Sequence, residues 1–226
     1  MRKIALLAVV ALGAACGGSS SDPAPAGASI TGTIATAPFT SASQLALVLS
    51  GDACTIAQAP GIQLGVSLAL ANVADVAGTC SQFNSSCLPN SRNLQLVIAK
   101  VHVPSTAFPS TTAPPFTPGA YQYADLNNLG AITPDASGNI SIFTGGVEVL
   151  GAAPACSATA GYGVSSGTLT ISTVSGSTLT GTVSVTLVNA STGAAAGSLS
   201  GTFTTATNCT PSPAPSACDL LTSIIP

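Results

Sequence analysis

Charged residues are the scarcest class in this chain. Asp, Glu, Lys and Arg make up 5% of its 226 residues, and four basic residues stand against seven acids, which gives a formal net charge of −3. Proteins that bind nucleic acids carry clustered basic residues, because contacts with the phosphate backbone supply much of their affinity. The shortage of basic residues therefore excludes a nucleic-acid partner.

Histidines and acids are too few and too scattered for most catalytic sites. His102 is the only histidine, and no Cys-x-x-Cys spacing occurs. The sequence therefore supplies few residues that could form a metal site, a cofactor site or a histidine general base. No two acids lie close enough in sequence to indicate a glycosidase pair. The acids are Asp22, Asp52, Asp75, Asp125, Asp135, Glu148 and Asp219. We expect no metal and no cofactor, and no residue is named as catalytic.

Long helical and membrane-spanning patterns are also missing. After residue 15 no segment reaches the ~18 uninterrupted apolar residues of a spanning helix. The chain has instead 46% hydrophobic residues together with 23 Gly and 16 Pro. This composition is that of a folded domain rather than a disordered polar chain, and the length suits one all-β domain.

The clearest pattern is a period of two in residues 179–188 and 199–205. Apolar residues and glycine alternate there with Ser and Thr, so we expect one face of each segment to pack in the core and the other to be exposed to solvent. Pairing Leu187 with Leu199 places Val183 opposite Phe203 and keeps the apolar residues on one face. We predict adjacent antiparallel strands in this register. Residues 167–174 supply a third strand, with an odd-length turn favoured before residue 179.

Further strand patterns bring the total to about nine, joined by clusters of Gly, Pro, Asn and Ser. This arrangement predicts an all-β fold, an antiparallel β-sandwich of immunoglobulin-like or jelly-roll-like type. Single helical turns are expected as accessories. The further strands are 30–35, 44–50, 64–70, 94–103, 120–123 and 139–150, and the turns are 72–77, 123–129 and 218–225.

Three of these strands share a five-residue template with a central glycine, at Gly32, Gly181 and Gly201. A glycine inside a strand marks a bulge or a close approach by an aromatic ring or by backbone. Compositional bias in a Gly- and Thr-rich chain explains the repetition of the template, so no duplicated domains are inferred.

The first sixteen residues have the layout of an export signal. Arg2 and Lys3 form a basic start, residues 4–12 form an apolar centre, and small residues lead directly to Cys16. A polar tether rich in Gly and Ser follows the cysteine. These residues resemble the signal of bacterial outer-membrane lipoproteins, in which the cysteine is acylated and becomes the first mature residue.

The resemblance covers only this leader and tether, and it implies a signal peptide at residues 1–15 and a lipid-anchored tether at residues 16–27. The length and the strand patterns that follow predict a single β-sandwich domain at residues 28–226. The resemblance also implies attachment to a membrane of the cell envelope through Cys16, and Gly17 in place of an aspartate favours the outer membrane. An ordinary secretory signal with an incidental cysteine, which would give a secreted protein, is the alternative.

The remaining cysteines are even in number, as expected for disulfides in an exported chain. Three disulfides are predicted and their pairing is left open. Cys80 with Cys87, and Cys209 with Cys218, are near enough in sequence to close local loops. A metal site is the less favoured alternative. The six candidates are Cys54, Cys80, Cys87, Cys156, Cys209 and Cys218.

Two features could indicate catalysis, the motif at residues 163–167 and the single histidine His102, but we prefer a structural interpretation of each. Residues 163–167 match the Gly-x-Ser-x-Gly nucleophile elbow, but a strand pattern follows Ser165 where the elbow needs a helix, and His102 precedes it in the chain. Ser165 is therefore not expected to be a nucleophile. His102 shares a strand face with Lys100, and a solvated edge position is expected for it.

Two loops have sequences that indicate their structure. Residues 104–118 contain five prolines and predict a stiff extended connection, whose Phe108 and Phe116 either form an apolar binding lip or, as we prefer, tuck against the core. Residues 134–139 resemble a calcium loop but lack its alternating acids, so an Asx-type turn at Asp135 is predicted.

These observations favour a non-enzymatic, lipid-anchored module of the cell envelope that binds a protein, a glycan or envelope material. The alternative is a hydrolase whose site is assembled from residues distant in sequence. Convergent buried polar groups in a cleft would favour the enzyme, and a flat or loop-borne apolar patch would favour the binding module.

Overall fold

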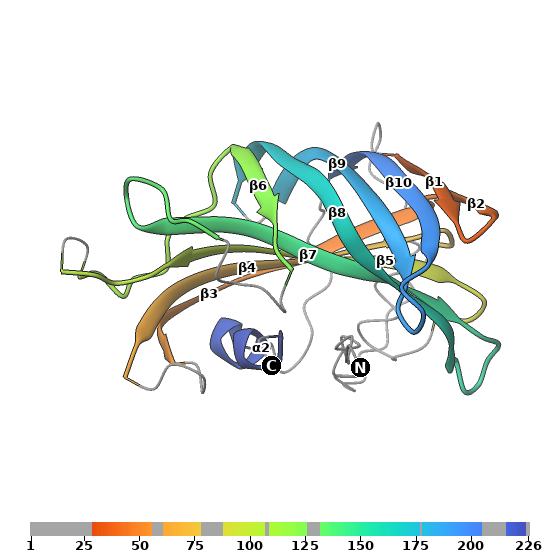
Figure 1. Cartoon of the computed structure of the whole chain (residues 1–226), viewed down its shortest axis with the longest axis horizontal. Coiled ribbons are helices and arrows are strands. Elements are labelled where there is room, and N and C mark those ends of the chain that lie inside the picture. The colour runs from red at the N-terminus through yellow and green to blue at the C-terminus, as the bar shows by residue number, and fades with distance from the viewer. Residues whose placement is uncertain are drawn as a thin grey trace.

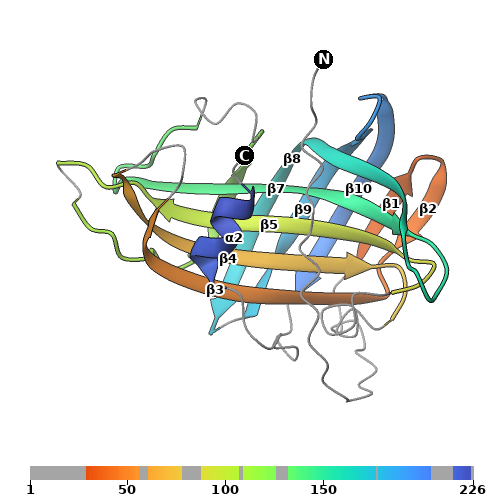
Figure 2. The same cartoon turned by 90° about the horizontal axis from the view of Figure 1, so that it is seen from below.

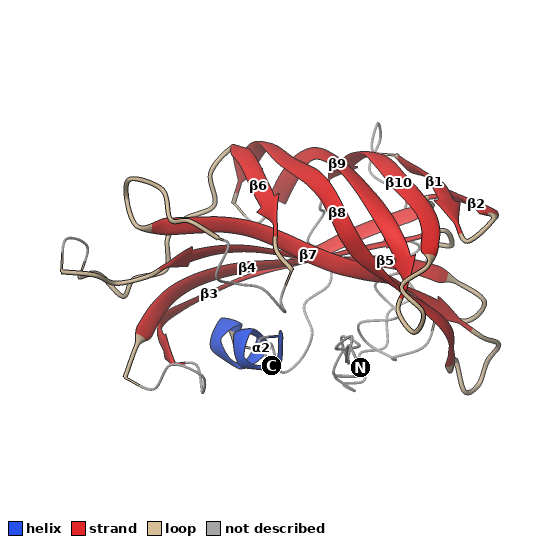
Figure 3. Ribbon diagram, viewed as in Figure 1, coloured by secondary structure: helices blue, strands red, loops and turns tan. Residues whose placement is uncertain are grey.

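The computed structural model describes residues 29–55, 61–77, 88–106, 109–125, 132–176, 178–204 and 216–224. Regular structure in these residues is almost entirely β, as the sequence predicted, and Figure 3 shows the strands with the short helix beside them. The elements are β1 (Ile30–Ile34), β2 (Ala37–Thr40), β3 (Ser43–Thr55), β4 (Gln63–Ala74), β5 (Arg92–His102), β6 (Gly119–Tyr123), β7 (Asn139–Leu150), β8 (Ala158–Ser175), β9 (Thr178–Asn189), β10 (Ala195–Thr204) and α2 (Ala217–Ile224).

The strands form one continuous hydrogen-bonded sheet, in the order β2-β1-β10-β9-β8-β6-β7-β5-β4-β3. Most neighbours are antiparallel, but β6 runs parallel to β7, so the sheet is mixed. β6 is inserted between β7 and β8 at one end, while β7 and β8 pair directly at the other. The two separate antiparallel sheets of a sandwich are therefore not confirmed.

The sheet curls until its two halves face each other across one core (Figure 1). Strands β1, β8, β9 and β10 cross over β4, β5 and β7, and their inward side chains share a single apolar cluster. The alternation in β9 produces this directly, because its buried and exposed residues take turns along the strand. The core thus lies between halves of one sheet rather than between two sheets. Its largest fully buried side chains include Phe39, Phe143, Phe203, Leu94 and Leu187.

The outer face of β3, β4 and β5 is apolar as well, and α2 covers part of it (Figure 2). Ala217 and Leu221 of the helix are buried against this face. The helix begins where the Ser216 hydroxyl accepts a hydrogen bond from the Asp219 amide at 3.0 Å, an N-cap. The helical turn predicted at residues 218–225 is confirmed.

The other two predicted helical turns, at residues 72–77 and 123–129, are not confirmed. Residues 72–74 continue β4, so a turn over 72–77 is wrong. The cross-strand ladder to β5 extends to Ala74, and that pairing outweighs the local sequence preference. The turn expected at residues 123–129 begins on the last residue of β6 and then passes outside the described residues.

Strands β9 and β10 are adjacent and antiparallel with the predicted faces, but their register differs by two residues. Leu199 pairs with Val185 and Phe203 pairs with Gly181. The turn after Asn189 and a one-residue bulge between Ala195 and Gly197 together set the observed register. Because the shift is even, every side chain keeps its face.

The connection from β8 to β9 is of even length, since Ser175 pairs with Thr178, so the odd-length turn is wrong. A bulge between Ile171 and Thr173 supplies the one-residue offset that the turn lacks. Leu169 and Ile171 therefore still lie on the core face.

The two edges of the sheet meet at one end. The edge strands β2 and β3 are consecutive in the chain and joined by Ser41 and Ala42. The Ser41 amide donates to the Ile30 carbonyl in one half of the sheet, and the Ala42 amide donates to the Ala74 carbonyl in the other. These bonds hold the curl closed at this end.

Residues 1–28, which contain the predicted signal peptide, Cys16 and the tether, lie outside the described residues. In the part of the chain that the structure describes, no helix is long and apolar enough to cross a membrane.

Candidate functional site

Polar side chains gather on the core face of the sheet at one end of the curl. Ser67, Lys100 and Ser141 pair across β4, β5 and β7, and the next pairs join Gly65, His102 and Asn139. Directly paired residues point to the same face, so these side chains form one group. We call Ser67, Lys100, His102, Asn139 and Ser141 the strap-end cluster.

The burial of Lys100 and His102 corrects the expectation of a solvated edge. Each residue is 7% exposed, and β5 is a central strand between β7 and β4. Alternation along β5 places Leu96 and Ile98 in the core and continues through Lys100 and His102. The two polar side chains therefore lie at the end of the core face and are buried, because β5 has a neighbouring strand on each edge.

Residues 109–118, which we call the strap, run across this end of the curl. The Ser67 hydroxyl donates to the Pro114 carbonyl at 2.7 Å. The Ala113 amide donates to Asp52 Oδ1 at 2.7 Å, and the Ala53 amide donates to the Thr111 carbonyl at 3.0 Å. The strap is thus an ordered cover for the strap-end cluster, and its extended course agrees with its prolines.

Lys100 is held through the strap. Its Nζ donates to Thr117 Oγ1 at 2.8 Å, and the Tyr121 hydroxyl donates to the Thr117 carbonyl at 3.2 Å. Burial raises the pKa of Tyr121 above its ordinary value. Within the described residues, which include every acid except Asp22, no carboxylate forms an ion pair with Lys100.

His102 is oriented by the loop before β7. Its Nδ1 lies 3.0 Å from Asn139 Oδ1. The predicted Asx turn precedes Asn139 and is confirmed, because Asp135 Oδ1 accepts hydrogen bonds from the amides of Ser137 and Asn139. These backbone hydrogen bonds, the one from Asn139 first, lower the pKa of Asp135.

Phe116 is the phenylalanine of the strap, and it is buried. Phe116 is 9% exposed, belongs to the main core and packs against Tyr121 with ring centroids 6.2 Å apart. This is the position that the core-tucked interpretation gives it. Phe108 lies outside the described residues.

Ser165 lies on the other side of the sheet from the strap-end cluster. Its neighbour Val164 points into the core, whereas Ser165 is exposed and its hydroxyl donates to the Thr186 carbonyl at 3.3 Å. His102 lies on the core face of β5. A nucleophile and base pairing between Ser165 and His102 is therefore not formed.

Cysteines form a covalent link between the sheet and α2. Cys54 of β3 is bonded to Cys218 of the helix, 164 residues away in sequence. Local pairing of Cys209 with Cys218 is therefore wrong. Cys156 is also disulfide-bonded, while Cys80, Cys87 and Cys209 lie outside the described residues. No group of His, Cys, Asp and Glu suited to holding a metal ion occurs in the described part of the chain.

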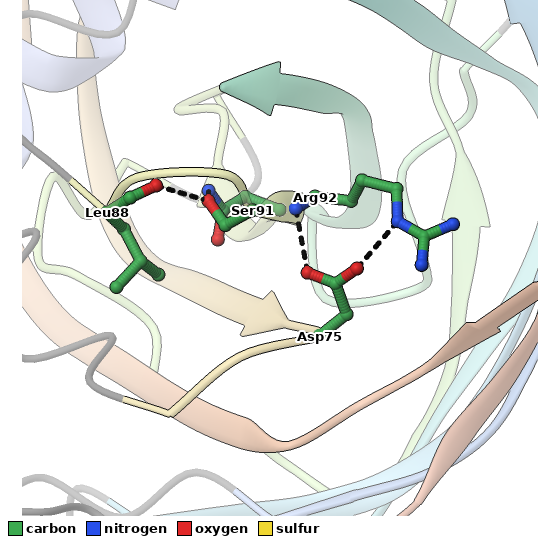
Figure 4. A network of polar contacts seen from close by, with 5 residues as sticks. Asp75, Leu88, Ser91 and Arg92 are labelled. Atoms are coloured by element: carbon green, nitrogen blue, oxygen red, sulfur yellow. Dashed lines mark hydrogen bonds and ion pairs between the residues drawn. The ribbon is translucent and has the colours of Figure 1, made fainter. Parts of the chain in front are cut away.

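A second polar network lies at the opposite end of β5 (Figure 4). Asp75 accepts hydrogen bonds from Arg92 Nε at 2.6 Å and from the Arg92 amide at 2.8 Å. The Arg92 guanidinium also lies 5.8 Å from the ring centroid of Phe39. The Ser91 hydroxyl donates to the Leu88 carbonyl at 2.6 Å. This network pins the chain entering β5.

The solvent side of β8, β9, β10, β1 and β2 carries rows of Ser and Thr side chains. Cross-strand pairing aligns them, and all are exposed. We call this surface the hydroxyl face. Its rows are Thr170, Thr182 and Thr202; then Thr168, Ser184, Ser200, Thr31 and Thr40; and then Ser166, Thr186, Ser198 and Thr33.

Two features of these sites could not be predicted from the sequence. The alternation of Thr and Ser was visible in single strands, but alignment into rows depends on the register between strands distant in the chain. The burial of Lys100 likewise depends on the position of β5 in the sheet.

Comparison of the chain with protein-family models, with curated proteins and with solved structures gives no match.

Proposed function

We propose that this protein is a non-enzymatic, lipid-anchored module of the cell envelope, and that its curled sheet binds a partner through the hydroxyl face. The observation that carries the proposal is the division of side chains between the two sides of the sheet. Lys100 and His102 are buried beneath the strap, whereas the exposed side of β1, β2, β8, β9 and β10 is rich in Ser and Thr and carries no charged residue.

Two features support the export that this location requires. The first sixteen residues resemble a lipoprotein signal that ends at Cys16. The bond between Cys54 and Cys218 is of a kind that forms and persists in oxidising compartments. In this proposal residues 1–15 are removed, and acyl groups on Cys16 hold the domain to the outer membrane.

The proposed anchor has a physical requirement. Each buried methylene contributes about 0.8 kcal/mol, so one acyl chain binds a membrane reversibly, and two or more bind it stably. Only Arg92 and Lys100 remain as basic residues after residue 15, and both are engaged within the fold. Electrostatic attraction to anionic lipids therefore adds little, and Cys16 carries the attachment alone.

The test is metabolic fatty-acid labelling combined with membrane fractionation in a bacterium that processes lipoproteins. We expect the wild-type chain to incorporate label and to sediment with outer membranes. Cys16→Ala should abolish labelling and leave the precursor unprocessed, while Cys156→Ala, which removes a cysteine of the domain, should still be labelled. An unlabelled wild-type protein free in the periplasm or medium would contradict the proposal.

The hydrolase alternative has no comparable support. Ser165 and His102 lie on different sides of the sheet. Two of the described acids are also far apart, since Asp75 binds Arg92 at one end of β5 while Asp135 closes a turn at the other end. Labelling of the wild-type chain by a serine-directed fluorophosphonate would revive this alternative.

A further inference from the structure

The hydroxyl face carries no charge. Strands β1, β2, β8, β9 and β10 contain no Asp, Glu, Lys, Arg or His. Typical designed and natural surfaces are about 25–35% charged. The one exposed large hydrophobic side chain among the described residues, Ile62, precedes β4 and lies outside this face. The face therefore suits neither ion pairing nor the docking of an apolar helix.

The hydroxyl groups of this face form a regular array. Neighbouring strands in a sheet lie about 4.8 Å apart, and alternate residues along a strand are about 6.8 Å apart. Thr182 stands between Thr170 and Thr202, and Ser184 stands between Thr168 and Ser200. Each hydroxyl can donate one hydrogen bond and accept two. At the border of the array, the Thr173 and Thr180 hydroxyl oxygens lie 2.5 Å apart, so neighbouring strands bring such groups within bonding distance.

The array is also rigid. The same strands place Leu169, Val183, Val185 and Leu199 in the core on their opposite face, which fixes the backbone beneath the hydroxyls. Threonine is β-branched and stiff about its first side-chain torsion. Donors and acceptors that are ordered before binding lose little conformational entropy when a ligand arrives.

We propose that the hydroxyl face binds an uncharged polysaccharide laid across its rows. This inference rests on the proposed function as a binding module and names the chemical class of its partner. A neutral polysaccharide offers what the face can recognise: repeated hydroxyl donors and acceptors along an extended chain, with no charge that would need a counter-ion. An anionic polymer would meet no cation on these strands.

The strength of binding depends on repetition. A single hydroxyl hydrogen bond adds little, because it replaces one made to water. Several bonds made to one long polymer act together, since the first holds the next groups at high effective concentration. Long chains are therefore bound, short oligosaccharides are bound weakly, and salt has little effect because no charges are paired.

The experiment is co-sedimentation of the full chain with insoluble cellulose and chitin, which are neutral, and with insoluble alginate, which carries carboxylates. We expect the wild type to sediment with a neutral polymer at low and high salt, and not with alginate. The triple variant Thr168→Val, Thr182→Val, Thr186→Val removes three exposed hydroxyls and keeps the shape and strand propensity of each residue. Its affinity should fall about tenfold or more.

The matched control is Thr55→Val, Thr106→Val, Thr133→Val, which changes three exposed threonines outside the hydroxyl face and should bind like the wild type. Equal urea midpoints for the two triple variants exclude loss of folding. The inference is overturned if the wild type binds neither neutral polymer, prefers alginate, releases in high salt or keeps its affinity in the first variant. Self-association through this face, seen as a dimer that the first variant dissolves, would also overturn it.

Fatty-acid labelling of the same preparations separates the two proposals. A labelled, membrane-bound chain that binds no neutral polymer retains the envelope location and loses the polysaccharide partner. A chain that binds cellulose or chitin but carries no lipid at Cys16 retains the partner and loses the anchor.

Discussion

The ring of Phe203 lies directly over Gly181 on the neighbouring strand. A Cβ atom at Gly181 would stand 2.9 Å from Phe203 Cζ and 2.1 Å from the Thr170 carbonyl oxygen. The close approach predicted for the central glycines is therefore confirmed here, with an aromatic ring on one side and backbone on the other. Gly201 shows the backbone form, since its Cβ would meet the Ser29 carbonyl oxygen at 1.9 Å. Glycine at these positions lets three strands and a phenyl ring pack without a gap.

We predict that Gly181→Ala lowers the free energy of unfolding by about 1–3 kcal/mol, the usual cost of overpacking a core. The added methyl meets the Thr170 carbonyl, which is backbone and cannot rotate away. The neighbouring exposed substitution Thr182→Ala is the control and should cost less than about 1 kcal/mol. Urea denaturation followed by circular dichroism measures both. Equal stability of Gly181→Ala and the wild type would show that the strands can separate at little cost.

A second prediction concerns the link between β3 and α2. The double variant Cys54→Ala, Cys218→Ala should lower the free energy of unfolding by about 2–5 kcal/mol, since the bond closes a loop of 164 residues in the unfolded chain. Replacing both cysteines leaves neither Cys54 nor Cys218 as a free thiol that could exchange with the disulfide of Cys156. Thermal denaturation compares it with the wild type under non-reducing conditions. An unchanged midpoint would mean that α2 stays docked through Ala217 and Leu221 alone.

A third prediction concerns the buried lysine. Lys100→Met should raise the free energy of unfolding by about 1–3 kcal/mol, because it removes a buried cation that has no carboxylate partner in the described residues. Thr117→Ala should act in the opposite direction by about 1–3 kcal/mol, because it removes the acceptor and keeps the cation. Chemical denaturation at neutral pH gives both values. A destabilised Lys100→Met would indicate that the contact with the strap outweighs the cost of burying the charge.

A fourth prediction follows from Glu148 on β7. Burial raises the pKa of this half-buried carboxyl above its ordinary value of 4.5. The folded state then holds a proton that the unfolded state has released, so stability falls as pH rises from 4.5 through the raised pKa. Glu148→Gln should therefore be more stable than the wild type at neutral pH and equal to it well below pH 4.5. Denaturation midpoints across this range test the prediction, and parallel curves for the two proteins would contradict it.

Much of the fold was accessible from the sequence because local alternation sets it. The hydrophobic face of each strand, the helical turn after Ser216 and the Asx turn at Asp135 all depend on residues within a few positions of one another. The register of β9 against β10 was wrong by two residues, because neither the turn after Asn189 nor the bulge between Ala195 and Gly197 leaves a mark in the alternation. An even shift preserves the faces, so the burial pattern was right where the pairing was not.

The candidate sites were less accessible. Lys100 and His102 share a strand face as the sequence indicated, but a period of two does not distinguish a central strand from an edge. The pairing of Cys54 with Cys218 joins segments whose proximity depends on the curl of the sheet. The hydroxyl rows run over the consecutive strands β8, β9 and β10 and continue onto β1, which is distant in sequence and joins them by pairing with β10.

By itself the sequence determined that the chain is all-β, that strands such as β9 and β10 have one buried and one exposed face, and that few charged groups are available for chemistry. These properties follow from composition and from the alternation of side chains along an extended backbone. Only the tertiary structure decided that the strands form one curled sheet, because the joining of β1 to β10 and the split around β6 are non-local pairings. That curl buries Lys100 beneath the strap and aligns the exposed threonines into rows, since both outcomes depend on which strands become neighbours.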